Sequence, residues 1–271
     1  MKYMLSVDIE GISGVISWKQ AGIEHEEYGE ARKLMTKEAD AAIKGLYEGG
    51  AESVLVTDGH GSMRNLIIEE LDERVEIIMG WPRVKCMMEG LSEELAGVGF
   101  VGYHSSAHSY GTLAHTYSGS VVDKICVGDK MASEFALNSY LAAQYGVPVI
   151  FISGDQETIR EAQELYPEIP HVISKYSRGR YSARCIHPSK VRTEIRRVIK
   201  EAVENHKGKL IKPEDTKFNV WFTDSGKLDN LELLPEIERV GPKEFIIDTG
   251  DFEKNYKLFR ACTMLAHAAT Q

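Results

Sequence analysis

The chain has 271 residues, of which 43% are hydrophobic and 27% charged, and its formal net charge at pH 7 is −9. This length and apolar fraction allow a buried core in one large or two smaller domains, as in a soluble globular protein. The negative charge argues against nucleic acid or an anionic membrane as a partner, because either would require a dense Lys/Arg patch.

The amino-terminal segment and the cysteines both predict a cytoplasmic protein. The start, MKYMLSVDIEG, has an apolar run that is too short and too polar for a signal peptide or a membrane span. The cysteines are scattered and form neither a CxxC pair nor a zinc-finger spacing: Cys86, Cys126, Cys185 and Cys262. We expect them to be reduced, buried small hydrophobic side chains.

The first two thirds of the chain have the pattern of an α/β fold. Short apolar runs alternate with longer stretches of helical period, which indicates a mainly parallel sheet with crossover helices. Strands are predicted at residues 3–7, 53–57, 75–79, 97–102 and 148–153. Helices are predicted at residues 26–50, 132–146, with Ser133 as an early capping residue, and 157–167.

Beyond Val172 the alternation loosens into a smaller α+β portion. A helix at residues 187–208, strands at 218–223 and 244–250, and a terminal helix at 255–271 are predicted there. The expected organisation is an α/β domain of residues 1–190, which would carry the chemistry, and an α+β portion of residues 191–271 that can pack as one unit with it.

Acidic and imidazole side chains follow the predicted parallel strands. Asp8 and Glu10 follow the first strand, His60 the second, His104 the fourth and Asp155 the fifth. In a parallel sheet these positions share one edge, where open α/β folds bind their ligands. Asp8 and Glu10 are two residues apart, so in extended chain they point the same way and repel each other unless a cation lies between them.

Two carboxylates with two imidazoles form a donor set that suits zinc, or else manganese, iron or cobalt, whereas calcium and magnesium prefer oxygen ligands alone. If Asp8 uses both of its oxygens, it can bridge two cations, and metal pairs about 3.5–4 Å apart hydrolyse amides and phosphates in many enzymes. The pattern therefore predicts a divalent-metal site, and hydrolysis is a chemistry that a bridged metal pair would suit.

Individual members of this set have plainer interpretations. Asp155 can equally be the cap of the following helix, and a histidine such as His60 at a strand end is usually a satisfied structural residue. Asp58 can orient an imidazole or simply stabilise a turn. The glycines beside His60 favour a ligand-bearing loop, because they let the backbone approach closely.

The segment at residues 102–120 holds three of the nine histidines in a loop rich in glycine and serine. His104, nearest the strand, is the expected ligand, and His108 is expected at the surface. His115 lies farther along, where it can overhang the metals as general base, acid or nucleophile. No GxSxG elbow, P-loop or GxGxxG turn is present, so serine-hydrolase and nucleotide-dependent functions are disfavoured.

Five ordered blocks carry a resemblance to a known family. They are SVDIEG, TDGHGS, GYHSSA, AHTYSG and ASEFALNSYLAAQYGVPVIFISGD. The chain resembles, from residue 1 to about 190 and more loosely to its end, the DppA-type D-aminopeptidases (peptidase family M55). These are zinc-dependent metallopeptidases that release D-amino acids from the amino end of short peptides.

The resemblance implies two zinc ions per subunit, with Asp8, Glu10, His60, His104 and Glu134 as ligands and His115 as the catalytic residue. Glu134 comes from the resemblance alone, because an acid in the first turn of a helix is ordinarily explained by the helix dipole. The resemblance also implies a ring-shaped homo-oligomer whose active sites face an enclosed cavity. The sequence TLAHTY departs from the family's usual Ser-His-Ser-Met context, which leaves substrate preference open.

The expected function is that of a zinc-dependent aminopeptidase that releases N-terminal D-amino acids, such as D-Ala, from short peptides through a dinuclear metal-activated water. A dimetal hydrolase of other amides or of phosphate esters is one alternative. A non-catalytic binding protein stabilised by its metal is another.

Overall fold

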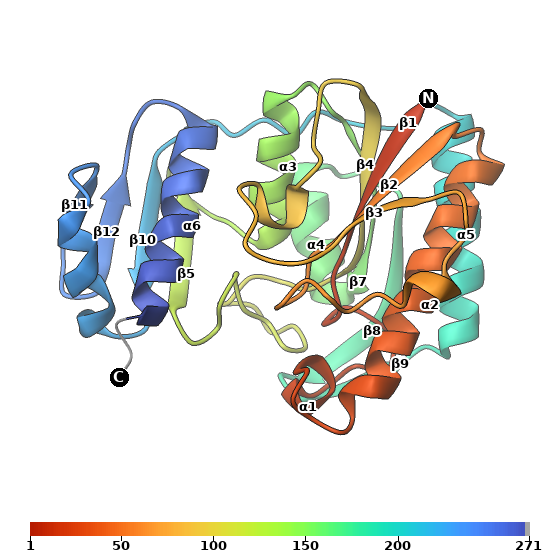
Figure 1. Cartoon of the computed structure of the whole chain (residues 1–271), viewed down its shortest axis with the longest axis horizontal. Coiled ribbons are helices and arrows are strands. Elements are labelled where there is room, and N and C mark those ends of the chain that lie inside the picture. Colours follow the sequence, from red (N-terminus) through yellow and green to blue (C-terminus); the bar gives the residue numbers. More distant parts are fainter. Residues whose placement is uncertain (269–271) are drawn as a thin grey trace.

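The computed structural model describes residues 1–268 and contains two β-sheets (Figure 1). Sheet A is built from β1 (Lys2–Val7), β2 (Ser53–Asp58), β3 (Glu76–Ile78), β4 (Leu95–Tyr103), β7 (Val149–Asp155), β8 (His171–Gly179) and β9 (Ser182–Cys185). Its strand order is β3-β2-β1-β4-β7-β8-β9, and all neighbours are parallel except β8 and β9. This confirms the predicted α/β fold with a mainly parallel sheet.

Sheet B is antiparallel and lies beside sheet A, at the left of Figure 1. It contains β5 (Val122–Val127), β6 (Lys130–Met131), β10 (Phe218–Phe222), β11 (Ile237–Arg239) and β12 (Glu244–Ile247), in the order β11-β12-β10-β5-β6. Strands β5, β6, β8, β9 and β11 were not predicted, because their short runs mix apolar with charged residues and lack a clear alternation.

The helices are α1 (Trp18–Ala21), α2 (Tyr28–Glu48), α3 (Glu134–Gln144), α4 (Gln156–Leu165), α5 (Pro188–Glu204) and α6 (Phe252–Ala268). Three 3₁₀ segments of the described chain are Ile68–Glu70, Cys86–Met88 and Ser225–Leu233. The predicted helices are confirmed, and the expected cap Ser133 accepts a hydrogen bond from the Ala136 backbone N–H. The last residues of the expected terminal helix, 269–271, lie outside the described part of the chain.

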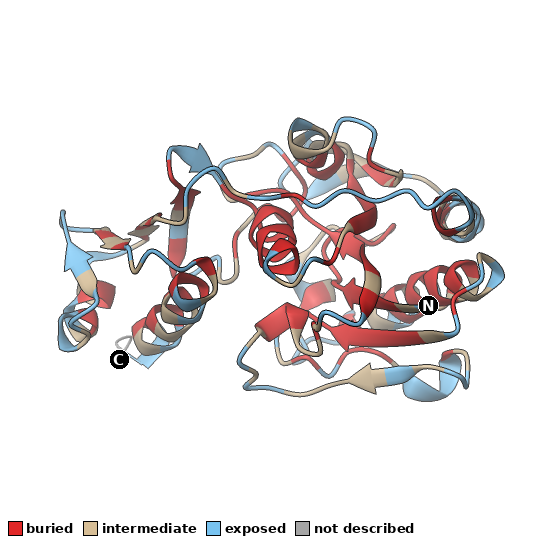
Figure 2. Cartoon of the chain, turned by 90° about the horizontal axis from the view of Figure 1, so that it is seen from above, coloured by how far each residue is buried: buried red, intermediate tan, exposed pale blue. Residues whose placement is uncertain are grey.

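Sheet A separates two hydrophobic cores. On β1, Met4 belongs to the core that contains α3, α4, α6 and sheet B, whereas Tyr3 and Leu5 belong to the core beneath α2 and α5. This alternation is the side-chain period of a strand covered by helices on both faces. Buried residues accordingly fill the interior, and exposed residues lie at the periphery (Figure 2). The central strands are thus covered on both faces, and the loops of the site start from their buried ends.

Two glycines let the loops after β1 and β4 approach each other closely. A Cβ on Gly11 would lie 1.9 Å from the carbonyl oxygen of Tyr103, and one on Gly102 would lie 2.3 Å from that of Asp8. Gly102 also has φ = +71°, a conformation that side chains with a Cβ rarely adopt. The Gly11 N–H donates to the Gly102 carbonyl at 2.8 Å. This contact places Asp8 and His104 side by side.

The expected boundary at residue 190 falls within the first turn of α5, which packs on α2. Sheet B joins β5, which precedes that boundary, to β10, which follows it. The division into residues 1–190 and 191–271 stays a prediction. Among residues 1–268, no helix has the length and apolar character needed to cross a bilayer.

The four cysteines are free, as expected for reduced thiols. Cys86, Cys126 and Cys262 are buried, but the expectation of burial was wrong for Cys185, which is exposed. Cys185 ends β9, an edge strand of sheet A, so no neighbouring strand covers it.

Candidate metal centre

Asp8, His60 and His104 meet at one edge of sheet A, at the carboxyl ends of β1, β2 and β4. One carboxylate oxygen of Asp8, Oδ1, lies 3.3 Å from Nδ1 of His60, and the other, Oδ2, lies 3.4 Å from Nε2 of His104. Asp8 therefore stands between the two imidazoles, with one oxygen facing each. The positional argument made from the sequence is correct for these three residues.

Two further carboxylates complete the cluster. Glu10 Oε2 lies 3.1 Å from Nδ1 of His60, and Glu134 Oε1 lies 3.2 Å from Nε2 of His104. Glu134 is the first residue of α3, so the start of this helix aims its side chain at the sheet edge. Asp8, Glu10 and Glu134 are 2%, 1% and 3% exposed, so three carboxylates share a site from which water is largely excluded.

The hydrogen bonds of the imidazoles fix which ring nitrogen carries the proton. Each of the three rings has one nitrogen against a backbone carbonyl oxygen, which can only accept. The pairs are His60 Nε2 with Ala21 O at 2.8 Å, His104 Nδ1 with Ser105 O at 3.0 Å, and His115 Nδ1 with Leu113 O at 3.0 Å. In each neutral ring that nitrogen donates, and the other nitrogen presents a lone pair to the carboxylates.

When the rings are neutral, the form that binds a metal ion, lone pairs face lone pairs across the cluster. Both side-chain oxygens of Glu10 and Nε2 of His104 are buried without a hydrogen-bond partner among residues 1–268. Groups that could hold a metal ion are Asp8, Glu10 and His104, and His104, His115 and Glu134. A divalent cation that accepts nitrogen and carboxylate oxygen together, such as zinc, fits this donor set and would satisfy the unpaired atoms.

His115 lies against the cluster. Its ring stacks on that of His104 with centroids 4.0 Å apart, and Nε2 is 3.8 Å from Oε1 of Glu134. Trp18 packs edge-on against the ring at 5.2 Å. The pKa of His115 is lowered to about 4, first by burial and then by His104. These contacts hold the imidazole in one orientation at the wall of the site.

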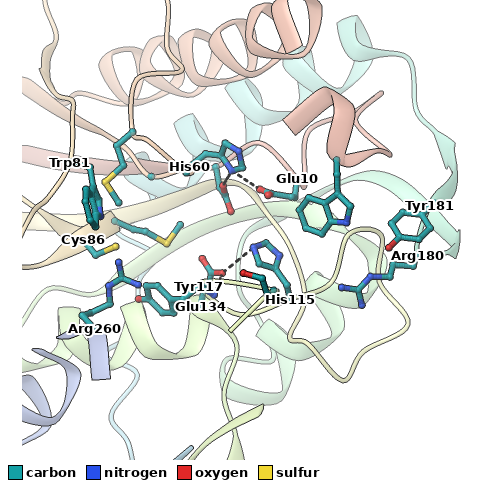
Figure 3. A pocket seen from close by; sticks show the side chains of 18 residues that line it. Glu10, His60, Trp81, Cys86, His115, Tyr117, Glu134, Arg180, Tyr181 and Arg260 are labelled. Atoms are coloured by element: carbon teal, nitrogen blue, oxygen red, sulfur yellow. Dashed lines mark hydrogen bonds and ion pairs between the residues drawn. The ribbon is translucent and has the colours of Figure 1, made fainter. Parts of the chain in front are cut away.

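The cluster opens into a cavity of about 510 Å³ (Figure 3). Glu10, His60, His115 and Glu134 lie in its middle, Arg260 and Trp81 at one end, and Arg180 and Tyr181 at the other. Such a volume accommodates a ligand of a few residues next to the cluster.

Comparison with known proteins decides the family. The sequence model of peptidase family M55, described as D-aminopeptidase, matches residues 1–261. The chain belongs to the D-aminopeptidase family. It is 30% identical, over 269 residues and 98% of each chain, to a D-aminopeptidase of Bacillus subtilis (strain 168). It also matches a solved structure, "Zn-dependent D-aminopeptidase DppA from Bacillus subtilis, a self-compartmentalizing protease", with a TM-score of 0.95, 30% identity and full coverage of both chains.

Membership of the D-aminopeptidase family makes the chain a hydrolase of the peptidase class and confirms the resemblance found in the sequence. The fold class is confirmed by the same solved structure. The individual ligands and the catalytic role of His115 are not given by these matches.

Other polar residues of the expected site have structural roles. Asp155 is the N-cap of α4 and also accepts the Thr112 backbone N–H at 2.7 Å, so it anchors the histidine-rich loop. Asp58 accepts hydrogen bonds from the backbone N–H groups of Asn65 and Leu66. It therefore stabilises a turn, the second of the two roles considered for it, and does not orient an imidazole. His108 is at the surface, as expected, with Asp123 at 3.3 Å.

Lys175 of β8 was missed by sequence reasoning. The side chain is fully buried, and Nζ donates to the carbonyl oxygens of Glu10, Ile12 and Val15. Burial lowers the pKa of Lys175 to about 8, so the amine still carries its proton at pH 7. The ammonium therefore fixes the loop that carries Glu10, which no local sequence signal revealed.

The Lys175→Met variant is expected to lose about 3 kcal/mol of unfolding free energy, because three buried carbonyls lose their donor. Zinc affinity is expected to fall as well, since the loop of Glu10 is released. Urea denaturation and zinc titration measure both effects. Lys207→Met, at an exposed position, is the control and should change stability by no more than about 0.5 kcal/mol. Equal stability of the two variants would contradict the assignment.

Zinc binding is expected to weaken as the pH falls. Burial, reinforced by Glu10, raises the pKa of Asp8 to about 7. Burial by itself lowers the pKa of His104, but the charges of Glu134 and Asp8 outweigh the effect of burial and raise this pKa to about 10. Because a zinc ligand must be deprotonated, each displaced proton should cost about tenfold in affinity per pH unit below its pKa. Competition with a chromophoric chelator between pH 8 and pH 5.5 measures this slope; a flat profile would contradict it.

Proposed function

We propose that the chain is a zinc-dependent aminopeptidase that releases N-terminal D-amino acids, such as D-Ala, from short peptides. The supporting observation is the cluster of buried carboxylates and lone-pair imidazole nitrogens that opens into the cavity. The relatives support the substrate class, because a matched protein of known structure is a Zn-dependent D-aminopeptidase.

Two zinc positions per subunit are proposed, one on each side of Asp8. Asp8, Glu10 and His60 would hold one ion, since Nδ1 of His60 faces both carboxylates. Asp8, His104 and Glu134 would hold the other, since Nε2 of His104 faces that second pair. Zinc supplies Lewis-acid polarisation of the scissile carbonyl and lowers the pKa of a water nucleophile.

The protein's own groups then position and transfer the proton. The Leu113 carbonyl holds Nδ1–H of His115, so Nε2 is free on the cavity side to act as base, acid or nucleophile. His104 and Trp18 keep the ring from turning. The D-preference would come from the cavity wall around the substrate's α-carbon.

A substrate panel tests the proposal. The zinc-loaded protein is assayed with D-Ala-D-Ala, L-Ala-L-Ala and a chromogenic phosphate ester, and zinc per chain is measured on the same preparation. Release of D-Ala from the first substrate, with two zinc ions per chain, is expected. Faster hydrolysis of the L-peptide or of the phosphate ester would replace the proposal by the wider class of dimetal hydrolases.

The enzyme is further proposed to work in the cytoplasm as a ring-shaped homo-oligomer. Four free cysteines suit a reducing compartment, and the matched solved structure is described as a self-compartmentalizing protease. An enclosed chamber would admit short peptides and exclude folded proteins. Light scattering of the purified protein tests the assembly, and a monomeric mass would refute it.

A further inference from the structure

The cavity of the metal centre contains an arginine that forms no ion pair with an acidic residue among residues 1–268. Arg260, on α6, lies at the end of the cavity beside Tyr117 (Figure 3). Its Nε atom is buried and has no hydrogen-bond partner within residues 1–268. The guanidinium carbon lies over the ring of Tyr117, 4.7 Å from the centroid. This stacking holds the side chain in place and leaves Nε without an acceptor.

Two other arginines of the described chain, Arg83 and Arg239, have acceptors for their donors. Arg83, also partly buried, donates to the carbonyls of Asp58 and Ile78. Arg239 pairs with two carboxylates, Asp229 and Glu232. A buried donor left unpaired costs free energy, more so when it is charged. Arg260 therefore calls for an acceptor that comes from outside the chain.

Tyr117 links this arginine to the metal centre. Its backbone N–H donates to Oε1 of Glu134 at 2.6 Å. Its hydroxyl donates to the amide oxygen Oδ1 of Asn138 at 2.9 Å and lies 2.8 Å from the hydroxyl of Tyr256. Tyr117 is thus fixed at its backbone and at its hydroxyl. Its ring contacts Arg260, and its backbone contacts the proposed metal ligand Glu134. Glu134 and Arg260 line the same cavity, so a short peptide bound at the metal centre would extend its carboxyl end toward the guanidinium.

We propose that Arg260 binds the C-terminal carboxylate of the substrate and so selects peptides of two or three residues with a free carboxyl end. A guanidinium matches a carboxylate with two parallel hydrogen bonds, which makes it specific for this group over a neutral amide. The inference rests on the proposed peptidase function and names the substrate class of that same site. Arg260 is a specificity residue, distinct from the groups that act on the scissile bond.

A matched pair of substrates tests the inference: D-Ala-D-Ala and its C-terminal amide, which differ only in the carboxylate. The wild-type enzyme is expected to prefer the free acid. In Arg260→Met, kcat/KM for the acid should fall about 10- to 100-fold, the range of a charge-assisted hydrogen-bond pair, while the value for the amide stays within about threefold. Arg260→Lys keeps the positive charge but loses the two parallel N–H donors of the guanidinium. Its kcat/KM for the acid should lie between those of the wild type and Arg260→Met.

Arg180→Met is the comparison variant, because Arg180 is exposed at the opposite end of the cavity. It should keep the preference for the acid. Loss of that preference in Arg180→Met instead of Arg260→Met would overturn the inference. An equal fall in kcat/KM for the acid and the amide in Arg260→Met would also overturn the inference. So would dissociation of the oligomer with an unchanged ratio of kcat/KM for acid and amide, because that result would assign the guanidinium to a contact with a neighbouring subunit.

Calorimetric binding separates this inference from the proposed function. The two dipeptides are titrated into zinc-loaded His115→Ala protein with and without Arg260→Met. If the acid binds more tightly than the amide only when Arg260 is present, the carboxylate site is supported. Inactivity of the wild-type enzyme on D-peptides would refute the peptidase proposal and leave this binding result intact. Equal affinity for the acid and the amide in the presence of Arg260 would refute the carboxylate site.

Discussion

Replacing Asp8 by asparagine is expected to abolish zinc binding at both positions and reduce peptide hydrolysis by at least about 10³-fold, because activation of water requires the metal. Asp8 presents one oxygen to His60 and the other to His104. Asparagine exchanges one of these oxygens for an NH₂ group, which would donate to the lone pair of the facing imidazole. That hydrogen bond would draw the asparagine amide and the imidazole together and occupy the space in which the cation is proposed to lie.

The same substitution is expected to leave the metal-free protein at least as stable as the metal-free wild type. Asp8 and Glu10 are both buried, and their mutual repulsion contributes to the raised pKa of Asp8. Asparagine removes one of the two charges. Zinc analysis, peptide assays and melting curves of the chelator-treated proteins measure the three effects. Asp129→Asn, at an exposed position, is the control and should match the wild type. Retention of two zinc ions by Asp8→Asn would refute the bridging assignment.

The site's outline was predictable because it depends on topology. Apolar runs identified β1, β2 and β4, and parallel strands bring their carboxyl ends to one edge. Asp8, His60 and His104 therefore had to come together once the sheet was parallel. Asp155 shows the limit of this argument: it occupies the same edge after β7, but its carboxylate is used to cap α4 and to hold Thr112.

The rest of the site depends on contacts between segments far apart in the sequence. Glu134 was indistinguishable from an ordinary first-turn acid, since only the docking of α3 on β4 directs it at His104. Lys175 lies in a strand that was not predicted at all. Arg260 is a polar position on a terminal helix, and nothing local distinguishes it from a solvated one.

One departure from the family pattern gains a physical meaning. Tyr117 occupies a position in TLAHTY at which the sequence differs from the usual Ser-His-Ser-Met context. In the structure its ring carries the guanidinium of Arg260, and its backbone N–H binds Glu134. An aromatic residue there provides a ring face for a cation, which the methionine of the usual context would not provide. With Arg260 in its proposed role, a change at this position would alter substrate preference, while the backbone N–H that binds Glu134 would remain.

Replacing His115 by alanine is expected to lower kcat by about 10²- to 10⁴-fold, the usual contribution of a positioned proton-transfer group. The bound zinc should remain at two ions per chain, because the proposed ligands make their contacts without His115. His108→Ala, in the same loop but at the surface, should retain wild-type turnover.

Zinc analysis of His115→Ala decides between the two roles that the geometry allows. His115, with His104 and Glu134, forms one of the groups able to hold a metal ion, so the residue could itself be a ligand. Loss of one zinc ion together with activity would make it a ligand. Loss of turnover at full zinc occupancy would make it the catalytic group, consistent with the 3.8 Å that separates its Nε2 from Glu134, the longest of the contacts between these imidazoles and carboxylates.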